Sequence, residues 1–191
     1  METISLGVAL ALTGAALAMI LAGIGSVHGV CKIGSASSAL LAKEPKHFSK
    51  LLILMLLPSS QSIYALTVSF MVFVRLGLLP GADFMPINTD AGLAILFLCL
   101  PVGVIGGISA SLQGSVGVNC VSMYAKQNKL FGNSILVISA SEVFALFGFL
   151  ISMLGVLFLN LDYSLVVPYV ESAPAVEGAV ACISSYITAV C

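Results

Sequence analysis

Glu142 is a carboxylic acid inside a mostly apolar run, Ser134–Leu161, that is long enough to cross a membrane. A carboxylate at bilayer depth is costly, so its presence favours a role in binding an ion or a proton. Three further polar side chains lie inside other apolar runs: Ser60 and Gln61 in one, and Gln113 in another. Together the four groups supply one negative oxygen, two amide oxygens and a hydroxyl.

A proline beside these groups adds backbone oxygen to the set. Pro58 has no N–H and its ring clashes one turn back, so it interrupts helical hydrogen bonding. A carbonyl freed in this way, such as that of Leu57 or Leu54, can then face another partner. Tyr64 lies three residues after Gln61 and shares roughly its helical face, so its hydroxyl could reach a carboxylate.

This set of ligands is hard, contains only oxygen and carries one formal charge, which suits a monovalent cation such as Na⁺. Mg²⁺ and Ca²⁺ usually require more carboxylates. A proton needs only Glu142 and one hydrogen-bond partner, so the surplus of oxygen favours Na⁺ and the proton is the alternative. The other groups also have structural interpretations: interhelical hydrogen bonding for Gln61 and Gln113, a kink for Pro58, bonding within its own helix for Ser60, and packing for Tyr64.

The composition predicts the environment of these residues. The 191-residue chain is 60% hydrophobic and 8% charged, and its mean hydropathy is +1.17. No soluble domain of this size could hide so much apolar surface, so the chain is predicted to be an integral membrane protein. The sequence has no basic patch for nucleic acid. It also has no nucleotide-binding loop and no nucleophile–base pair, so an enzyme is the weakest interpretation.

Four long apolar segments predict an all-α fold of four membrane spans. They cover about Ile4–Leu41, Phe48–Leu79, Ala91–Ala125 and Asn133–Leu161. The sequence therefore predicts a first transmembrane hairpin over 1–79, an extracytoplasmic loop over 80–90, a second transmembrane hairpin over 91–160 and an extracytoplasmic tail over 161–191.

The basic residues predict the orientation of these spans. Six of the seven Lys and Arg residues lie in or beside the first and third connections, whereas the termini and the middle loop carry acidic residues. By the positive-inside rule, the first and third connections are cytoplasmic and both termini are extracytoplasmic. The protein is thus expected in the cell membrane as a multi-pass protein. Arg75, near the outer end of the second span, is the exception and is expected to snorkel.

The two hairpins are copies of one unit. Ser60 and Gln61 align with Ser141 and Glu142 at an offset of 81 residues. The first and third spans align at an offset of 85, where Gln113 corresponds to His28, which is expected to be packed or to face a loop. The chain is therefore a tandem duplication with a carboxylate in one copy and an amide in the other.

Small residues form a stripe along the first span and another along the third. Close backbone approach over small side chains drives helix packing in lipid. Two such stripes suggest the inner wall of a ring, although ordinary pairing within one four-helix bundle explains them equally well. The glycines of the stripes are Gly7, Gly14, Gly25, Gly29, Gly103, Gly107 and Gly114.

Taken together, these features resemble a known family. The segments Leu56–Tyr64, Leu112–Gly114 and Ser141–Gly148, with the duplication and the stripes, are similar to the K (c-type) proteolipid of V/A-type rotary ATPases. The similarity covers about residues 4–160 and is closest to the bacterial Na⁺-transporting branch. It implies that identical four-helix subunits form a membrane ring, and that this ring rotates.

The resemblance also implies a site and partners. Its ion ligands would be the Leu57 carbonyl, Ser60, Gln61, Gln113 and Glu142, with Tyr64 hydrogen-bonded to the carboxylate and Pro58 supporting the break. The ring would lie in lipid, contact a stator subunit with an essential Arg, and connect through a central-stalk subunit to a soluble head that holds the ATP sites. No organic cofactor is implied, and each chain would carry one ion.

Other interpretations remain open. The same ring could translocate protons. A four-span channel or small secondary transporter would require a wet pathway lined by polar residues, and the small-residue stripes are nearly free of them. Members of the family usually end soon after the fourth span, so the tail at 161–191 is hypothesised to fold against the mouth of the ring or into its lumen.

Overall fold

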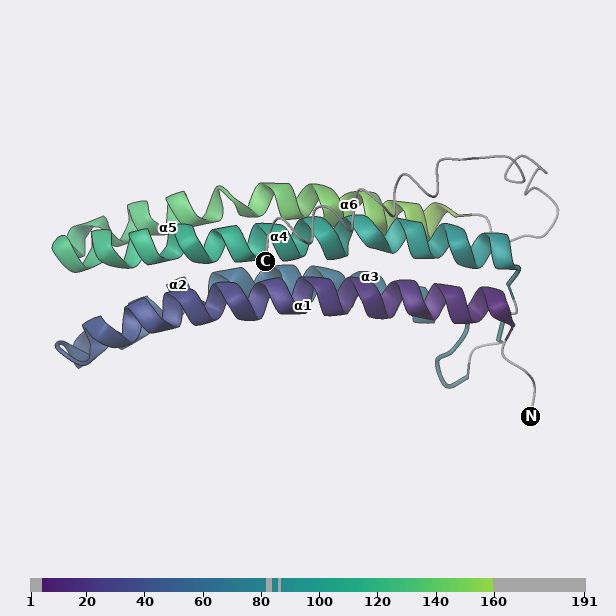
Figure 1. The fold of residues 1–191 in the computed structure, drawn as a ribbon, viewed down its shortest axis with the longest axis horizontal. Helices are drawn as coiled ribbons and strands as arrows, with labels where there is room; N and C mark the ends of the chain where they lie inside the picture. Colours follow the sequence, from purple (N-terminus) through teal and green to yellow (C-terminus); the bar gives the residue numbers. More distant parts are fainter. Residues whose placement is uncertain (1–4, 82–83, 86, 160–191) are drawn as a thin grey trace. The chain divides into compact units, whose positions relative to one another are not determined.

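A computed structural model describes residues 5–81, 84–85 and 87–159 of the chain. Within these residues every regular element is a helix, and no strand occurs (Figure 1). The elements, in chain order, are α1 (Leu6–Leu41), η1 (Pro45–His47), α2 (Phe48–Leu56), η2 (Leu57–Ser59), α3 (Ser60–Arg75), α4 (Thr89–Lys126), η3 (Asn128–Leu130), α5 (Phe131–Ser139) and α6 (Glu142–Phe158).

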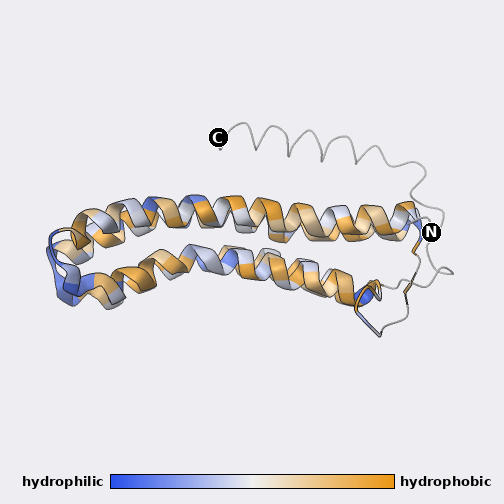
Figure 2. Cartoon of the chain, turned by 90° about the horizontal axis from the view of Figure 1, so that it is seen from below, coloured by the Kyte–Doolittle hydropathy of each residue, from blue (hydrophilic) through white to orange (hydrophobic). Residues whose placement is uncertain are grey.

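These elements form four helical segments that are long and apolar enough to cross a membrane. The predicted all-α, four-span fold is therefore confirmed. Apolar residues cover the helices, and hydrophilic residues gather at the end that carries the first and third connections, which we call the loop end (Figure 2). At 1.5 Å per residue the 36 residues of α1 extend about 54 Å, well beyond a hydrocarbon core of about 30 Å.

Glycines bring α1 and α4 into backbone contact. This is the most extensive helix pair in the described part of the chain. A Cβ atom on Gly25 would overlap the carbonyl of Gly107, and one on Gly114 would overlap the backbone of Gly29. Each of the seven stripe glycines lies in the same way against the other helix of the α1–α4 pair or, for Gly7, against the residues just before α4. The stripes therefore pair two helices of one chain, as the bundle interpretation expects, and the ring stays a prediction.

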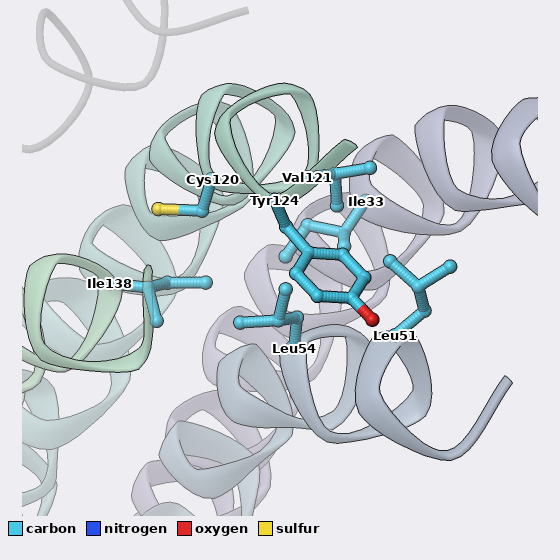
Figure 3. Close-up of a cluster of buried hydrophobic side chains, with 7 residues drawn as sticks. All are labelled: Ile33, Leu51, Leu54, Cys120, Val121, Tyr124 and Ile138. Carbon is cyan, nitrogen blue, oxygen red and sulfur yellow. The ribbon is translucent and has the colours of Figure 1, made fainter. Parts of the chain in front are cut away.

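A buried cluster joins the two hairpins near the loop end. Its members are Ile33, Leu51, Leu54, Cys120, Val121, Tyr124 and Ile138. Figure 3 shows the phenol ring of Tyr124 among the aliphatic side chains. The Tyr124 hydroxyl lies 2.6 Å from Nδ1 of His47, and Nε2 of His47 lies 2.8 Å from the Glu44 carboxylate. The Lys46 ammonium and the His47 ring lower the pKa of the Glu44 carboxyl.

The bounds of the spans differ from the predicted ones. The second span ends at Arg75 rather than Leu79, because Gly77 takes a positive φ of 66° and closes the helix. The N–H of Leu78 then donates to the Phe73 carbonyl at 3.1 Å, in a Schellman arrangement. Arg75 does more than snorkel, since its guanidinium donates to the Leu159 carbonyl at the end of α6.

The second hairpin also differs from its prediction. Its first helix begins at Thr89, two residues before the expected start. The fourth span is two helices, α5 and α6, separated at Ala140–Ser141, whereas the sequence predicted one continuous run. The hypothesised position of the 161–191 tail lies outside the described residues.

The packing of α1 on α4 predicts the effect of a single methyl group. Gly25→Ala should destabilise the protein by about 1–3 kcal/mol, because the new Cβ overlaps the Gly107 carbonyl and the helices must separate. The midpoint of thermal unfolding, followed by circular dichroism in mild detergent, measures this effect. Gly132→Ala is the matched control, since nothing lies within 4 Å of its Cβ position. Equal midpoints for the two variants would contradict the close contact.

Candidate ion-binding site

The second span, which contains α2 and α3, and the fourth span, which contains α5 and α6, are each interrupted. The first interruption is η2, where Pro58 removes a backbone donor and the chain takes one 3-10 turn. The second is the turn at Ala140–Ser141 between α5 and α6, where no proline occurs. The two interruptions are equivalent in the duplication, and each leaves backbone carbonyls to be satisfied by side chains.

The same serine bond occurs at each interruption. The Ser60 hydroxyl donates to the Leu57 carbonyl at 2.9 Å, and the Ser141 hydroxyl donates to the Ile138 carbonyl at 2.8 Å. Ser60 thus bonds within its own helical segment, as its structural interpretation expects. This bond also places the hydroxyl oxygen of Ser60 next to the carbonyl oxygen of Leu57, so two predicted ligands adjoin each other.

A buried amide pair links the two hairpins. Nε2 of Gln61 donates to Oε1 of Gln113 at 2.8 Å, and both side chains are fully buried. Nε2 of Gln113 in turn donates to the Ile138 carbonyl at 3.1 Å. Oε1 of Gln61 lies 3.3 Å from the Ser60 hydroxyl. The structure therefore brings Leu57, Ser60, Gln61 and Gln113 into one connected network.

Glu142 joins the site through Tyr64. The Tyr64 hydroxyl donates to Oε1 of Glu142 at 2.7 Å, which connects α3 to the first turn of α6. Glu142 is partly exposed, and its neighbour Val143 and nearby Leu146 are exposed apolar residues. No Lys, Arg or His lies within 4 Å of Glu142 in the described residues. The carboxylate therefore lies at an exposed, apolar edge of the network, and no cationic side chain of the described residues balances its charge.

The two halves differ in how their freed carbonyls are satisfied. The Ile138 carbonyl accepts from both Ser141 and Gln113, which occupies its two lone pairs. The equivalent carbonyl, that of Leu57, accepts only one side-chain donor, Ser60. Position 28, the counterpart of Gln113, is a histidine and supplies no second side-chain donor. The backbone N–H of Ser60 also donates to the Leu57 carbonyl, so two donors of Ser60 occupy this carbonyl.

His28 takes no part in this network. It is exposed on α1 and lies 3.3 Å from the Ser111 hydroxyl, so the expectation that it is packed or faces a loop is wrong. Ser109 was missed by the sequence reasoning. Its hydroxyl donates to the Ser141 carbonyl at 2.8 Å and fixes the second interruption to α4. The offset of 81 residues, which maps η2 onto Ile138–Ala140, is the signal that could have revealed this interruption.

These features define a class: a multi-pass membrane protein made of two copies of one helical hairpin, with one carboxylate among neutral oxygen groups. The model of the ATP synthase C-subunit family matches the chain twice, over residues 13–72 and 96–155. The chain therefore belongs to this family. The two matches confirm the duplication and the resemblance to rotary ATPase proteolipids.

Named relatives agree with this assignment. The V-type sodium ATPase subunit K of Enterococcus hirae is 34% identical over 151 residues, which cover 79% of this chain and 92% of that protein. The A-type ATP synthase subunit K of Methanocaldococcus jannaschii is 30% identical over 142 residues, covering 74% and 59%. The 16 kDa proteolipid of the human V-type proton ATPase is 28% identical over 148 residues, covering 75% and 88%.

The amide pair predicts strong coupling between two substitutions. Gln61→Leu and Gln113→Leu should each destabilise the protein by about 1–3 kcal/mol, because each leaves buried partners unsatisfied. The double variant should cost clearly less than the sum of the two, since it removes both ends of the Gln61–Gln113 bond. The free energies of unfolding of the four proteins, measured by circular dichroism in a denaturing detergent without Na⁺, complete this double-mutant cycle. Strict additivity would show that the two amides do not interact.

Proposed function

We propose that this chain is the rotor-ring subunit of a V/A-type ATPase and that it carries Na⁺ across the membrane on Glu142. Membership of the family makes the chain a proteolipid subunit of a rotary ATPase rather than one of its catalytic subunits. The choice of Na⁺ and of its ligands is the proposal. The observation that carries it is the network of neutral oxygen groups beside a carboxylate that has no cationic partner among the described residues.

The number and type of oxygens favour Na⁺ over a proton. A proton on Glu142 would need only the carboxylate and one partner, which Tyr64 already provides. The Leu57 carbonyl and the Ser60 hydroxyl beside it have no role in holding a proton. Both are suitable ligands for a small hard cation. The relatives include both sodium and proton ATPase subunits, so the comparisons alone do not choose between the ions.

Binding of a cation requires one local change. Oε1 of Gln113 accepts a hydrogen bond from Nε2 of Gln61 in the structure. If the Gln61 amide turns over, its Oε1 faces Oε1 of Gln113, and two oxygens then converge where a hydrogen bond was. Such an arrangement is repulsive without a cation between the oxygens and favourable with one. The turn of this amide is therefore coupled to Na⁺ binding.

The proposed cycle follows from charge. Na⁺ held by Glu142 and neutral oxygens forms a complex without net charge, which can move past lipid at a far lower cost than a bare carboxylate. A stator subunit with an essential Arg would compete for the carboxylate and release the ion toward one side. Reloading from the other side, as ATP hydrolysis turns the ring through a central stalk, would complete transport. The basic connections at the loop end would face the cytoplasm.

A test of the carried ion follows directly. Dicyclohexylcarbodiimide reacts with a protonated carboxyl group in an apolar environment, and Na⁺ bound at Glu142 should block that reaction. We expect Na⁺ to slow the labelling of purified rings in a saturable manner, with K⁺ at equal ionic strength as the control salt. Glu142→Gln should abolish the labelling, as measured by intact-protein mass. Labelling that responds to pH and is indifferent to Na⁺ would favour the proton alternative instead.

The hydrogen bond between Tyr64 and Glu142 predicts a measurable loss of affinity. Tyr64→Phe removes a donor to the charged carboxylate, which should weaken Na⁺ protection about fivefold, for a loss of about 1 kcal/mol. Tyr124→Phe is a matched control, since it removes a phenol that bonds to His47 near the loop end. That variant should keep the Na⁺ affinity. Equal affinities in all three proteins would exclude Tyr64 from the site.

A further inference from the structure

Ser109 connects α4 to the interruption between α5 and α6. Its hydroxyl donates to the Ser141 carbonyl at 2.8 Å, and the residue is only 7% exposed. Four residues later, on the same face of α4, Nε2 of Gln113 donates to the Ile138 carbonyl at 3.1 Å. Ile138 lies in α5, and Ser141 is the residue just before α6. Two neighbouring donors of α4 therefore bind the chain on opposite sides of the interruption.

The interruption depends on such contacts because the local backbone does not impose it. No proline occurs at Ala140–Ser141, and both residues keep helical dihedral angles. The values of φ and ψ are −59° and −31° at Ala140 and −74° and −15° at Ser141. Alanine is also the residue that most favours a helix. Only small rotations therefore separate the interrupted chain from a continuous helix, and the hydrogen bonds from α4 oppose them.

The bond of Ser109 acts directly beside the carboxylate. The Ser141 carbonyl belongs to the peptide group that also contains the N–H of Glu142, so the bond fixes the backbone from which the Glu142 side chain starts. Each residue of a helix turns the chain by about 100°, so a change of winding at Ser141 would swing the carboxylate around the axis of α6. The 2.7 Å bond from the Tyr64 hydroxyl to Oε1 of Glu142 requires that the direction of this side chain be kept.

The equivalent position in the first hairpin cannot make this contact. The offset of 85 residues that relates the first and third spans maps Ser109 onto Ile24. Ile24 is 64% exposed, and its side chain has no hydrogen-bond donor. By contrast, the bonds that Ser60 and Ser141 make within their own segments occur at both interruptions. The Ser109 bond is therefore not a general requirement of an interrupted span, and it occurs at the interruption that precedes Glu142.

We propose that Ser109 is a positioning residue for the ion site and that its hydrogen bond to the Ser141 carbonyl holds the Glu142 carboxylate at the distance that suits Na⁺. The inference rests on the proposed function, since it concerns how Glu142 binds the ion. Selectivity between cations depends on the size and rigidity of the set of ligands. A carboxylate held in place favours a cation of one size, whereas a carboxylate free to move can close on a smaller one. Ser109 therefore contributes to the preference for Na⁺ over Li⁺ as well as to the affinity for Na⁺.

Ser109→Ala should raise the Na⁺ concentration for half-protection of Glu142 against carbodiimide about three- to tenfold, the loss expected for one hydrogen bond. The ratio of the Li⁺ to the Na⁺ half-protection concentration should also fall. Ser109→Cys, which keeps the volume and only a weak donor, should change both quantities in the same direction. Ser69→Ala is the matched control, because the buried Ser69 hydroxyl also donates at 2.8 Å to a carbonyl of another helix, that of Ala15 in α1. It should lower the midpoint of thermal unfolding as Ser109→Ala does and leave both ion properties unchanged.

The measurement uses intact rings of the full chain in detergent, with the labelling of Glu142 located by peptide mass and with ring mass as the check on assembly. Weaker Na⁺ protection and a smaller preference for Na⁺ over Li⁺ in the Ser109 variants, with parental values in Ser69→Ala, support the proposal. Parental values in the Ser109 variants, a loss of affinity without a change in the ratio, or equal changes in Ser69→Ala overturn it and leave the proposed function intact. A parent ring that Na⁺ does not protect overturns the proposed function first and this inference with it.

Discussion

The backbone contact between α1 and α4 is the constraint on which the rest of the structure depends. Glycines on both helices remove the side chains that would hold them apart, and Gly25 against Gly107 shows how close the approach is. Because the two helices are equivalent members of a duplication, fixing one against the other also fixes the level of each hairpin. The interruptions of the second and fourth spans then lie at the same level of the bundle, where the Tyr64 hydroxyl bonds to Glu142.

Within this frame the polar groups of the spans follow the rule that lipid imposes. Water does not satisfy a backbone carbonyl in the hydrocarbon core, so each interruption needs donors from the protein. Serine hydroxyls, the Gln113 amide and the Ser109 hydroxyl supply them. The candidate site is thus built from groups that also keep two broken helices stable. Gln61 and Gln113 have a structural role in this arrangement, because their hydrogen bond links the two hairpins.

Much of this arrangement could be predicted from the sequence because its signals are local. The apolar runs, the offsets of the duplication and Pro58 predicted the four spans, the paired hairpins and the first interruption. The second interruption was missed because no proline marks Ala140–Ser141, and its carbonyls are satisfied by residues of α4 that are remote in the sequence. The exposure of His28 was also missed, since it depends on which face of α1 packs against α3. Position along the chain does not give that face.

The unequal side-chain bonding of the Leu57 and Ile138 carbonyls has a consequence for redesigning the chain. The first hairpin has an amide at position 61 and a histidine at position 28, where the second hairpin has Glu142 and Gln113. A carboxylate at position 61 would lie beside Gln113, whose amide already donates to the Ile138 carbonyl. Gln61→Glu alone would therefore add a charge without the second side-chain donor that the Ile138 carbonyl has. The two hairpins match residue for residue at their interruptions and are not interchangeable there.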